Sequence, residues 1–308
     1  MLFVTTQPDS DYYIWQLQVQ LNNFKKFGCE DKSIVVFGYN PVIGINPKAK
    51  DLQKSTTAKV FFFPDERNLS ERLYLPSIRP HLLKRLFKSD PDLLCNQNFL
   101  YFDCDVIFSN YPDFSSLIEK KIIHLSDTTK FLTLKDVNSD TLLFQQMCHQ
   151  VGISSKTVKS NKEKTGGIIY MFKDIHYFNF EFWDKVEKDS VQLYKMMLVA
   201  NSADDYKQIM TANQLSMLWN LWLMGYDTEL TKELSVSWAT NPIGDWTKNN
   251  LFNDAGVEEK DRGFLFYKGD FHKITPFDTD LSYVSKDYCS IKYVEEIITT
   301  GNALKSEN

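Results

Sequence analysis

Two acidic residues in an apolar segment are the feature of this sequence most able to do chemistry. Asp103 and Asp105 stand in FLYFDCDVIF, residues 99–108. Carboxylates are costly in such surroundings unless they are paired or bound to a metal ion. Their hard oxygens suit Mg²⁺ or Mn²⁺, which would also bind a diphosphate. The pair therefore predicts a cation site, although solvated acids at a strand end or a helix cap would give the same short pattern.

The elements expected before the acids form a βαβ start. Residues 1–6, 34–37 and 59–63 are short apolar runs typical of buried strands, and helical spacing of apolar residues begins at Tyr12. A second helix is expected over residues 77–89, where Pro80 is tolerated in the first turn. Residues 99–108 then read as another central strand. Its end is where ligands bind in open α/β sheets, which favours the acid pair as a site.

The second half of the sequence is less regular. Residues 120–161 have no clear periodicity, and the lysine-rich stretch 156–164 is expected to be a mobile loop. Residues 166–172 (GGIIYMF) read as a strand, and helices are expected at about 177–199 and 206–224. From Asp227 onward short apolar runs alternate with turns. No repeat or linker is visible, so we expect one α/β domain over residues 1–308 with a C-terminal elaboration.

Composition limits the class of protein. Lys+Arg number 35 and Asp+Glu 40, giving a net charge of -5 and a pI near 5.6, which argues mildly against tight binding of DNA or RNA. The five cysteines are scattered, without a CxxC pair, as in a reducing compartment. No signal peptide and no run of 18 apolar residues is present in the 308 residues, so a soluble, cytoplasmic protein without a membrane span is expected.

The order of these elements and the acid pair resembles the nucleotide-sugar-dependent glycosyltransferases of the GT-A fold with a DxD motif, of viral or bacterial type. The resemblance implies a Rossmann-related mixed, largely parallel sheet flanked by helices. It implies that Asp103, Cys104 and Asp105 contact the nucleotide sugar, with Asp103 and Asp105 holding Mn²⁺ or Mg²⁺ on the diphosphate. Arg79, in the helix motif SIRPHLL, would face the nucleotide.

Further motifs similar to those of the family follow along the chain. The resemblance implies a nucleotide-binding part at about residues 1–110, an acceptor part at about 111–295 and a C-terminal tail over 296–308. Besides the residues above, it assigns nucleotide-sugar binding to Thr5, Thr6 and Gln7 at the end of the first strand, Gly166 and Gly167 of TGGIIY, and Lys268 of FYKGDFH. It assigns catalysis to Asn213 and Gln214 of ANQLSMLWN. Trp238 and Trp246 are candidates to stack on an acceptor.

Two positions depart from the family pattern. Asn213 stands where the family commonly has Asp, and an amide cannot act as a general base. Asn253 stands where the family often has a metal-binding His, so we expect the third metal ligand from His272 or Asp254. Without an assignable general base, retention of configuration at the sugar carbon is slightly favoured.

The resemblance implies a hexosyl- or pentosyltransferase that uses a nucleotide sugar, most readily a UDP-sugar. The acceptor stays open among a glycan, a protein, a lipid and a modified nucleic-acid base. A nucleotidyl or phosphoryl transferase is a first alternative, but TTQPDSD after the first strand lacks the glycine-rich phosphate loop usual in that class. A non-catalytic module that binds a nucleotide sugar or a carbohydrate is a second alternative.

Overall fold

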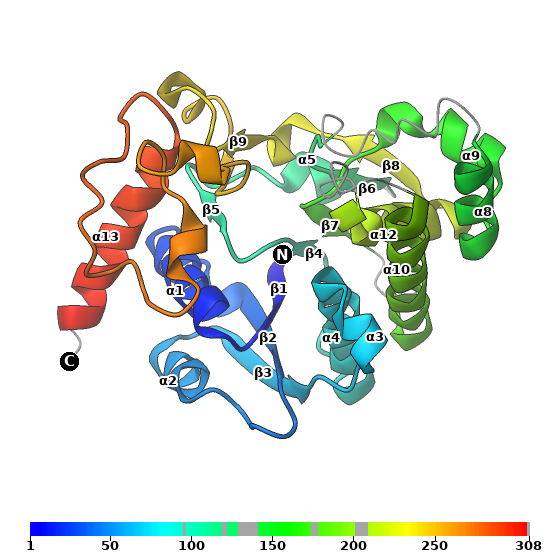
Figure 1. Ribbon diagram of the computed structural model, residues 1–308. Helices are drawn as coiled ribbons and strands as arrows, with labels where there is room; N and C mark the ends of the chain where they lie inside the picture. The colour runs from blue at the N-terminus through cyan, green and yellow to red at the C-terminus, as the bar shows by residue number, and fades with distance from the viewer. Residues whose placement is uncertain (95–96, 119–121, 129–140, 174–177, 201–208, 307–308) are drawn as a thin grey trace.

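A seven-stranded mixed sheet forms the centre of the computed structural model, which describes residues 1–94, 97–118, 122–128, 141–173, 178–200 and 209–306 (Figure 1). The strand order is β3-β2-β1-β4-β7-β6-β8. The bounds of these strands are β1 Leu2–Pro8, β2 Ser33–Tyr39, β3 Lys59–Pro64, β4 Phe99–Tyr101, β6 Ile122–Leu125, β7 Tyr170–Phe172 and β8 Asp227–Leu230. Parallel pairing joins β3, β2, β1 and β4, and also β6 with β8, whereas β7 runs antiparallel to both of its neighbours.

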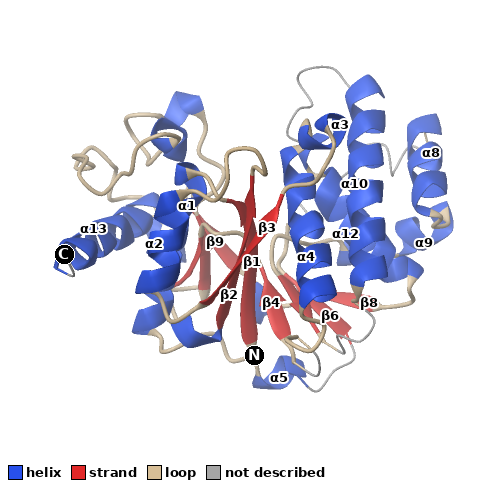
Figure 2. Cartoon of the chain, turned by 90° about the horizontal axis from the view of Figure 1, so that it is seen from below, coloured by secondary structure: helices blue, strands red, loops and turns tan. Residues whose placement is uncertain are grey.

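Helices cover both faces of this sheet (Figure 2). The α-helices are α1 Asp11–Lys26, α2 Pro47–Ser55, α3 Leu69–Arg72, α4 Ile78–Ser89, α5 Ser115–Ile118, α8 Leu142–Val151, α9 Ser155–Ser160, α10 Phe180–Ala200, α12 Ala212–Leu223 and α13 Ser290–Ser306. The 3₁₀ helices are η1 Glu30–Lys32, η2 Leu75–Ser77, η3 Lys162–Lys164, η6 Lys232–Leu234, η7 Ile243–Asp245, η8 Glu259–Asp261 and η9 Lys268–Phe271.

Strand β2 shows how the sequence produces these two helical layers. Its successive side chains point to opposite faces. Ile34 and Val36 pack in the core formed with α4, α10 and α12, whereas Val35 and Phe37 pack in the core formed with α1 and α2. The continuous apolar run predicted a strand buried on both faces, and both faces are covered.

The expected strand over residues 99–108 is wrong as a single element. Strand β4 ends at Tyr101 and stays in the large sheet, while β5 (Val106–Phe108) belongs to a second sheet with the order β5-β10-β9, in which β10 is Leu251–Asn253 and β9 is Val236–Trp238. A turn between β4 and β5 separates the two sheets, and both acids lie in it. The apolar residues on either side are buried, but in different sheets, which periodicity alone cannot distinguish.

The stretch expected as a mobile loop is ordered instead, and much of the expected C-terminal tail is helical. The lysine-rich stretch 156–164 lies mostly in α9 and η3, and Ser154 caps α9 by accepting a hydrogen bond from the Thr157 amide. Residues 296–306, expected as part of a tail, form the second part of α13. Helix α13 lies beside α1, where Asn22 donates to the Thr300 hydroxyl at 3.1 Å and Lys26 pairs with Glu296 at 2.6 Å (Figure 1).

The predicted fold class is confirmed: an α/β protein with a mixed, largely parallel sheet flanked by helices and a C-terminal elaboration. That elaboration comprises β9, β10, η9 and α13, with β5 completing its small sheet, and its core joins Trp15 of α1 to Phe252, Phe266 and Tyr293. Of the helices in the described ranges, none combines the length and the apolar character needed to cross a membrane.

Candidate active site

The turn between β4 and β5 holds the acid pair. The Val106 amide donates to the Asp103 carbonyl at 3.2 Å, which places Cys104 and Asp105 at the centre of the turn. Cys104 is buried, and its thiol lies 3.8 Å from Oε1 of Gln16 on α1. Because the backbone turns here, the two carboxylates meet different parts of the chain.

Asp103 faces α4. Its Oδ1 lies 2.9 Å from Nη1 of Arg79, and the two side chains are 22% and 23% exposed, so the pair can be reached from solvent. Burial raises the pKa of Asp103 above its usual range, and the Arg79 guanidinium offsets only part of this effect. Nearby, the Thr6 hydroxyl lies 2.9 Å from the Tyr101 hydroxyl and 3.5 Å from the Arg79 carbonyl. The structure thus brings the predicted residues Thr6, Arg79 and Asp103 together.

Asp105 faces the C-terminal elaboration. The Asn253 side-chain amide donates to its Oδ1 at 3.2 Å, and the Lys268 ammonium contacts its Oδ2. The same ammonium donates to the Asp254 carbonyl at 2.5 Å, and the Asp254 amide donates to the Asp105 carbonyl at 3.2 Å. Burial lowers the pKa of Lys268, but the Asp105 carboxylate more than compensates, so the net pKa is raised and the ammonium stays charged.

Asp254 is the unusual member of this group. It is 2% exposed, and neither carboxylate oxygen has a hydrogen-bond partner among the described residues. Burial raises its pKa to about 7, despite the opposing effect of Lys268. A buried carboxylate without donors is costly, so this side chain is prepared for a proton or for a cation.

The donor atoms around Asp105 fit a hard divalent cation. Among the described residues, the Asp254 carboxylate oxygens and Asn253 Oδ1 are buried without hydrogen-bond partners. Asp105, whose Oδ1 accepts from Asn253, and Asp103 in the same turn add further carboxylate oxygens. Such oxygen ligands are those that Mg²⁺ and Mn²⁺ prefer. In the part of the chain that the structure describes, no three His, Cys, Asp or Glu side chains are yet grouped closely enough to hold an ion. Arg79 and Lys268 pair with the two acids instead.

The glycine pair Gly166-Gly167 lies at the entrance to β7. A side chain at Gly166 would meet the Ser126 carbonyl at 2.4 Å, so only glycine fits there. The Ser126 hydroxyl donates to the Gly167 carbonyl at 2.6 Å and accepts from the Ile169 amide at 3.2 Å. Ile168 between them has φ of 83°, an uncommon conformation for a β-branched residue. The pair therefore forms a closely fixed loop, and its role toward a sugar stays a prediction.

The remaining predicted residues lie at three further places. Asn213 and Gln214 lie in the first turn of α12, and the backbone amide of Asn213 donates to the Tyr74 hydroxyl at 2.7 Å. Thr5 and Gln7 are buried in β1, where the Gln7 amide donates to the Thr5 hydroxyl at 3.3 Å. His272 is exposed and stacks on Tyr12, with ring centroids 4.3 Å apart.

Sequence reasoning missed the polar side chains that surround the acid turn. Gln16, Gln20 and Asn23 of α1 are each 1% exposed and face the segment 103–108. Their spacing of four and three residues is the available signal, because it places three amides on one face of the amphipathic helix α1. Tyr101, whose hydroxyl contacts that of Thr6, is likewise absent from the sequence-based candidates.

Comparison with known proteins gives a likeness of fold. No protein-family model matches the sequence, and no curated protein matches it. Similar solved structures include the apo WbbM bifunctional glycosyltransferase, with 9% identity over 97% of this chain and a TM-score of 0.43. The chain spans about half of that protein, 49% of its length.

Two other similar structures match over most of their own lengths. The galactosyltransferase LgtC, in complex with donor and acceptor sugar analogues, has 12% identity, coverage of 96% of this chain and 95% of its own, and a TM-score of 0.46. Mouse xyloside xylosyltransferase 1 in its apo form has 9% identity, coverage of 83% and 99%, and a TM-score of 0.39. All three are glycosyltransferases by name.

Proposed function

We propose that this protein is a glycosyltransferase that moves a sugar from a nucleotide-sugar donor, most readily a UDP-sugar, to an acceptor hydroxyl. The observation that carries the proposal is the grouping of the Asp105 turn with the buried, unpaired Asp254 carboxylate and two cationic side chains. Glycosyl transfer requires that the leaving nucleoside diphosphate be neutralised, and this is the chemistry that such a grouping supplies.

The acidic residues have the role of holding a cation. Asp103, Asp105 and Asp254, with the Asn253 amide oxygen, would hold Mn²⁺ or Mg²⁺, which when bound supplies positive charge to the diphosphate oxygens. The unpaired oxygens of Asp254 and Asn253 support this assignment more directly than the acid pair does. Asp254 is better supported than the exposed His272 as a ligand, because its backbone amide bonds to the Asp105 carbonyl and its carboxylate is buried without a donor among the described residues.

The basic residues have the role of binding phosphate. Arg79 and Lys268 have side chains that are 23% and 25% exposed, so each can contact a ligand in solvent while it remains beside an acid. Fixed positive charges of this kind stabilise charge on a leaving group without reorganising when the bond breaks. Thr5, Thr6 and Gln7 would then lie on the nucleoside side, and Gly166, Gly167, Asn213 and Gln214 on the sugar side.

The test is to incubate the protein with Mn²⁺ and a panel of sugar nucleotides and to measure which one is hydrolysed. Asp103→Ala and Asp105→Ala should each lower turnover by about 10²-fold or more, as expected for loss of groups that stabilise the transition state. Asp51→Ala is the matched control, because that side chain is 70% exposed and lies on α2.

Three results would contradict the proposal. Turnover of either site variant at the rate of the unsubstituted protein would remove the acids from the reaction. Release of a nucleoside monophosphate with a sugar phosphate, or of inorganic phosphate, in place of a nucleoside diphosphate and a free sugar would indicate nucleotidyl or phosphoryl transfer. Binding of a sugar nucleotide that survives chelation and loss of both acids, without turnover, would indicate a non-catalytic module.

A further inference from the structure

Helix α1 presents three buried amide side chains to the acid turn. Gln16, Gln20 and Asn23 follow one another at spacings of four and three residues, which places them on one face of the helix. Each is 1% exposed. Buried amides are retained only where their hydrogen bonds are made, so the partners of these groups show what the face does.

Gln20 bridges the turn. Its Nε2 donates to the Asp103 carbonyl at 2.9 Å and to the Val106 carbonyl at 2.7 Å. A primary amide carries two N–H donors, so this one group satisfies the first and last carbonyls of the turn. Asn23 fixes the next residues of the segment, because it donates to the Phe108 carbonyl at 3.1 Å and accepts from the Phe108 amide at 2.9 Å.

The strand ladders support only the two ends of the turn, where Phe102 bonds to β1 and Val106 pairs with Asn253 of β10. β4 ends at Tyr101 and β5 begins at Val106, so the turn lies between two sheets. Gln20 contacts the backbone on both sides of Cys104 and Asp105 without contacting either carboxylate. Loss of its amide would remove one donor from the Val106 carbonyl and one from the Asp103 carbonyl, which keeps the Val106 amide, and would loosen the backbone that orients the acids.

From this geometry we propose that Gln20 is a positioning residue that fixes Asp103 and Asp105 for cation binding. The proposal rests on the proposed function. Residues that orient metal ligands through hydrogen bonds typically change metal affinity by about 10- to 100-fold when they are replaced. Gln20 orients the acids in this indirect way, by donating to the backbone carbonyls of Asp103 and Val106.

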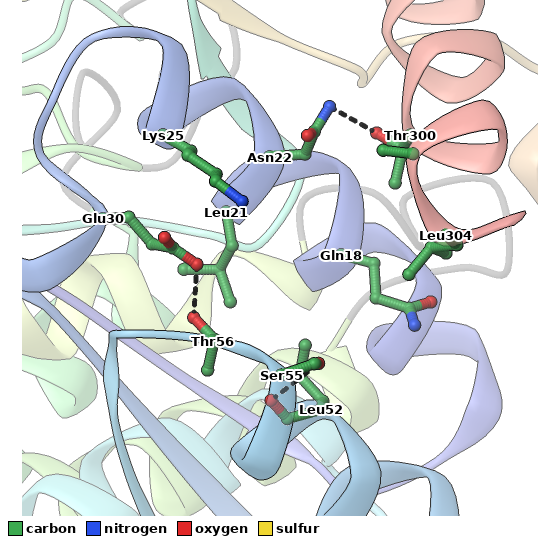
Figure 3. A pocket seen from close by; sticks show the side chains of 11 residues that line it. Gln18, Leu21, Asn22, Lys25, Glu30, Leu52, Ser55, Thr56, Thr300 and Leu304 are labelled. Atoms are coloured by element: carbon green, nitrogen blue, oxygen red, sulfur yellow. Dashed lines mark hydrogen bonds between the residues drawn. The ribbon is translucent and has the colours of Figure 1, made fainter. Parts of the chain in front are cut away.

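The opposite side of α1 offers a matched control (Figure 3). Gln18 and Asn22 line a crevice of about 50 Å³ between α1, α2 and α13, and Asn22 bonds to Thr300 of α13 rather than to the turn. Gln18 is therefore a glutamine on the same helix, two positions from Gln20, whose side chain faces away from Asp103 and Asp105.

The experiment measures Mn²⁺ binding to the full chain by electron paramagnetic resonance, without a sugar nucleotide. Gln20→Leu should weaken binding by about tenfold or more, whereas Gln18→Leu should change it less than about twofold. Gln20→Asn, which keeps the amide but is one methylene shorter, should also weaken binding and serves where Gln20→Leu does not fold. Thermal unfolding of each variant without Mn²⁺ separates loss of affinity from loss of folded protein.

The possible outcomes separate this inference from the function it rests on. Weak binding by folded Gln20→Leu or Gln20→Asn, with normal binding by Gln18→Leu, supports it. Normal Mn²⁺ binding by a folded Gln20 variant overturns the inference and leaves the proposed function intact. No binding by the unsubstituted protein contradicts the cation in the proposed function, and the inference falls with it.

Discussion

Asp103 and Asp105 are two residues apart, yet each is held by a different half of the molecule. Asp103 pairs with Arg79 of α4, which packs on the large sheet, and its side chain is 22% exposed. Asp105 pairs with Lys268 and Asn253 of the C-terminal elaboration, and its side chain is 9% exposed. The turn between the two sheets therefore joins two electrostatic environments.

The difference between these environments assigns different tasks to them. The Arg79 guanidinium is always charged and has donors left for a phosphate. The Asp105 side has two carboxylates, Asp105 and Asp254, beside one ammonium, and the described residues offer the Asp254 side chain no hydrogen-bond donor. In our account the Asp103–Arg79 side binds the diphosphate, while the Asp105–Asp254 side provides most of the cation site.

Replacement of the two basic residues tests this division with the largest expected effect. Arg79→Met and Lys268→Met should each lower kcat/KM by about 10²- to 10³-fold, because each removes fixed charge from the leaving group. Mn²⁺ binding should persist in both variants, since neither residue supplies a ligand. Steady-state kinetics and Mn²⁺ titration measure the two effects. Rates that stay normal in either variant would exclude that residue from phosphate binding.

A substitution in the closely packed η9 should have a second, smaller effect, on the stability of the fold. A side chain at Gly269 would lie 2.5 Å from the Tyr267 ring, whereas one at Gly244 of η7 would meet nothing within 4 Å. Gly269→Ala should destabilise the fold by about 1–3 kcal/mol and displace Lys268, while Gly244→Ala should be nearly neutral. Denaturant unfolding compares the two. Equal stabilities would show that η9 adjusts without cost and does not fix Lys268.

The pKa of Asp254 predicts a change in stability with pH that is at most about as large as the effect of Gly269→Ala. Its folded-state value of about 7 lies above the ordinary 3.8, so the folded protein retains a proton that the unfolded chain has released. Without metal, the protonated Asp254 side chain contributes fully to the free energy of unfolding below about pH 4. This contribution is lost as the pH rises through 7.

Asp254→Asn removes this dependence. Between pH 5 and 7, the unsubstituted protein should lose stability relative to the variant by at most about 1.4 kcal/mol per pH unit. Denaturant unfolding in chelator-containing buffer measures both proteins across this range. Parallel profiles would show that Asp254 is already satisfied in the folded state.

Much of the fold could be predicted because β1, β2 and β3 each contain a short apolar run, although only β1 and β2 are buried on both faces and the edge strand β3 is partly exposed. The end of β4 could not be predicted, because Phe102 and Val106 are as apolar as the strand residues. Only the pairing of β5 with β10 reveals the turn. Helix α13 was missed because its buried face contacts α1, more than 260 residues earlier in the chain.

The site was predictable in part for a similar reason. The acid pair stands out locally, and the family resemblance points to Arg79, whose guanidinium lies 2.9 Å from Asp103. The contact of Lys268 with Asp105 spans 163 residues, and that of Asn253 spans 148. No local pattern encodes such contacts, nor the burial that leaves Asp254 unpaired. The amides of α1 were visible in the sequence, but they read as ordinary polar residues of an amphipathic helix.

The most direct test is anomalous X-ray scattering from crystals of the protein grown with Mn²⁺ and UDP. Our account predicts one strong Mn²⁺ peak in contact with the carboxylates of Asp105 and Asp254, with the diphosphate beside Arg79 and Lys268. The same crystals of Asp105→Ala should lack that peak. Mn²⁺ or UDP bound away from the turn, with Asp254 still unpaired, would contradict the account.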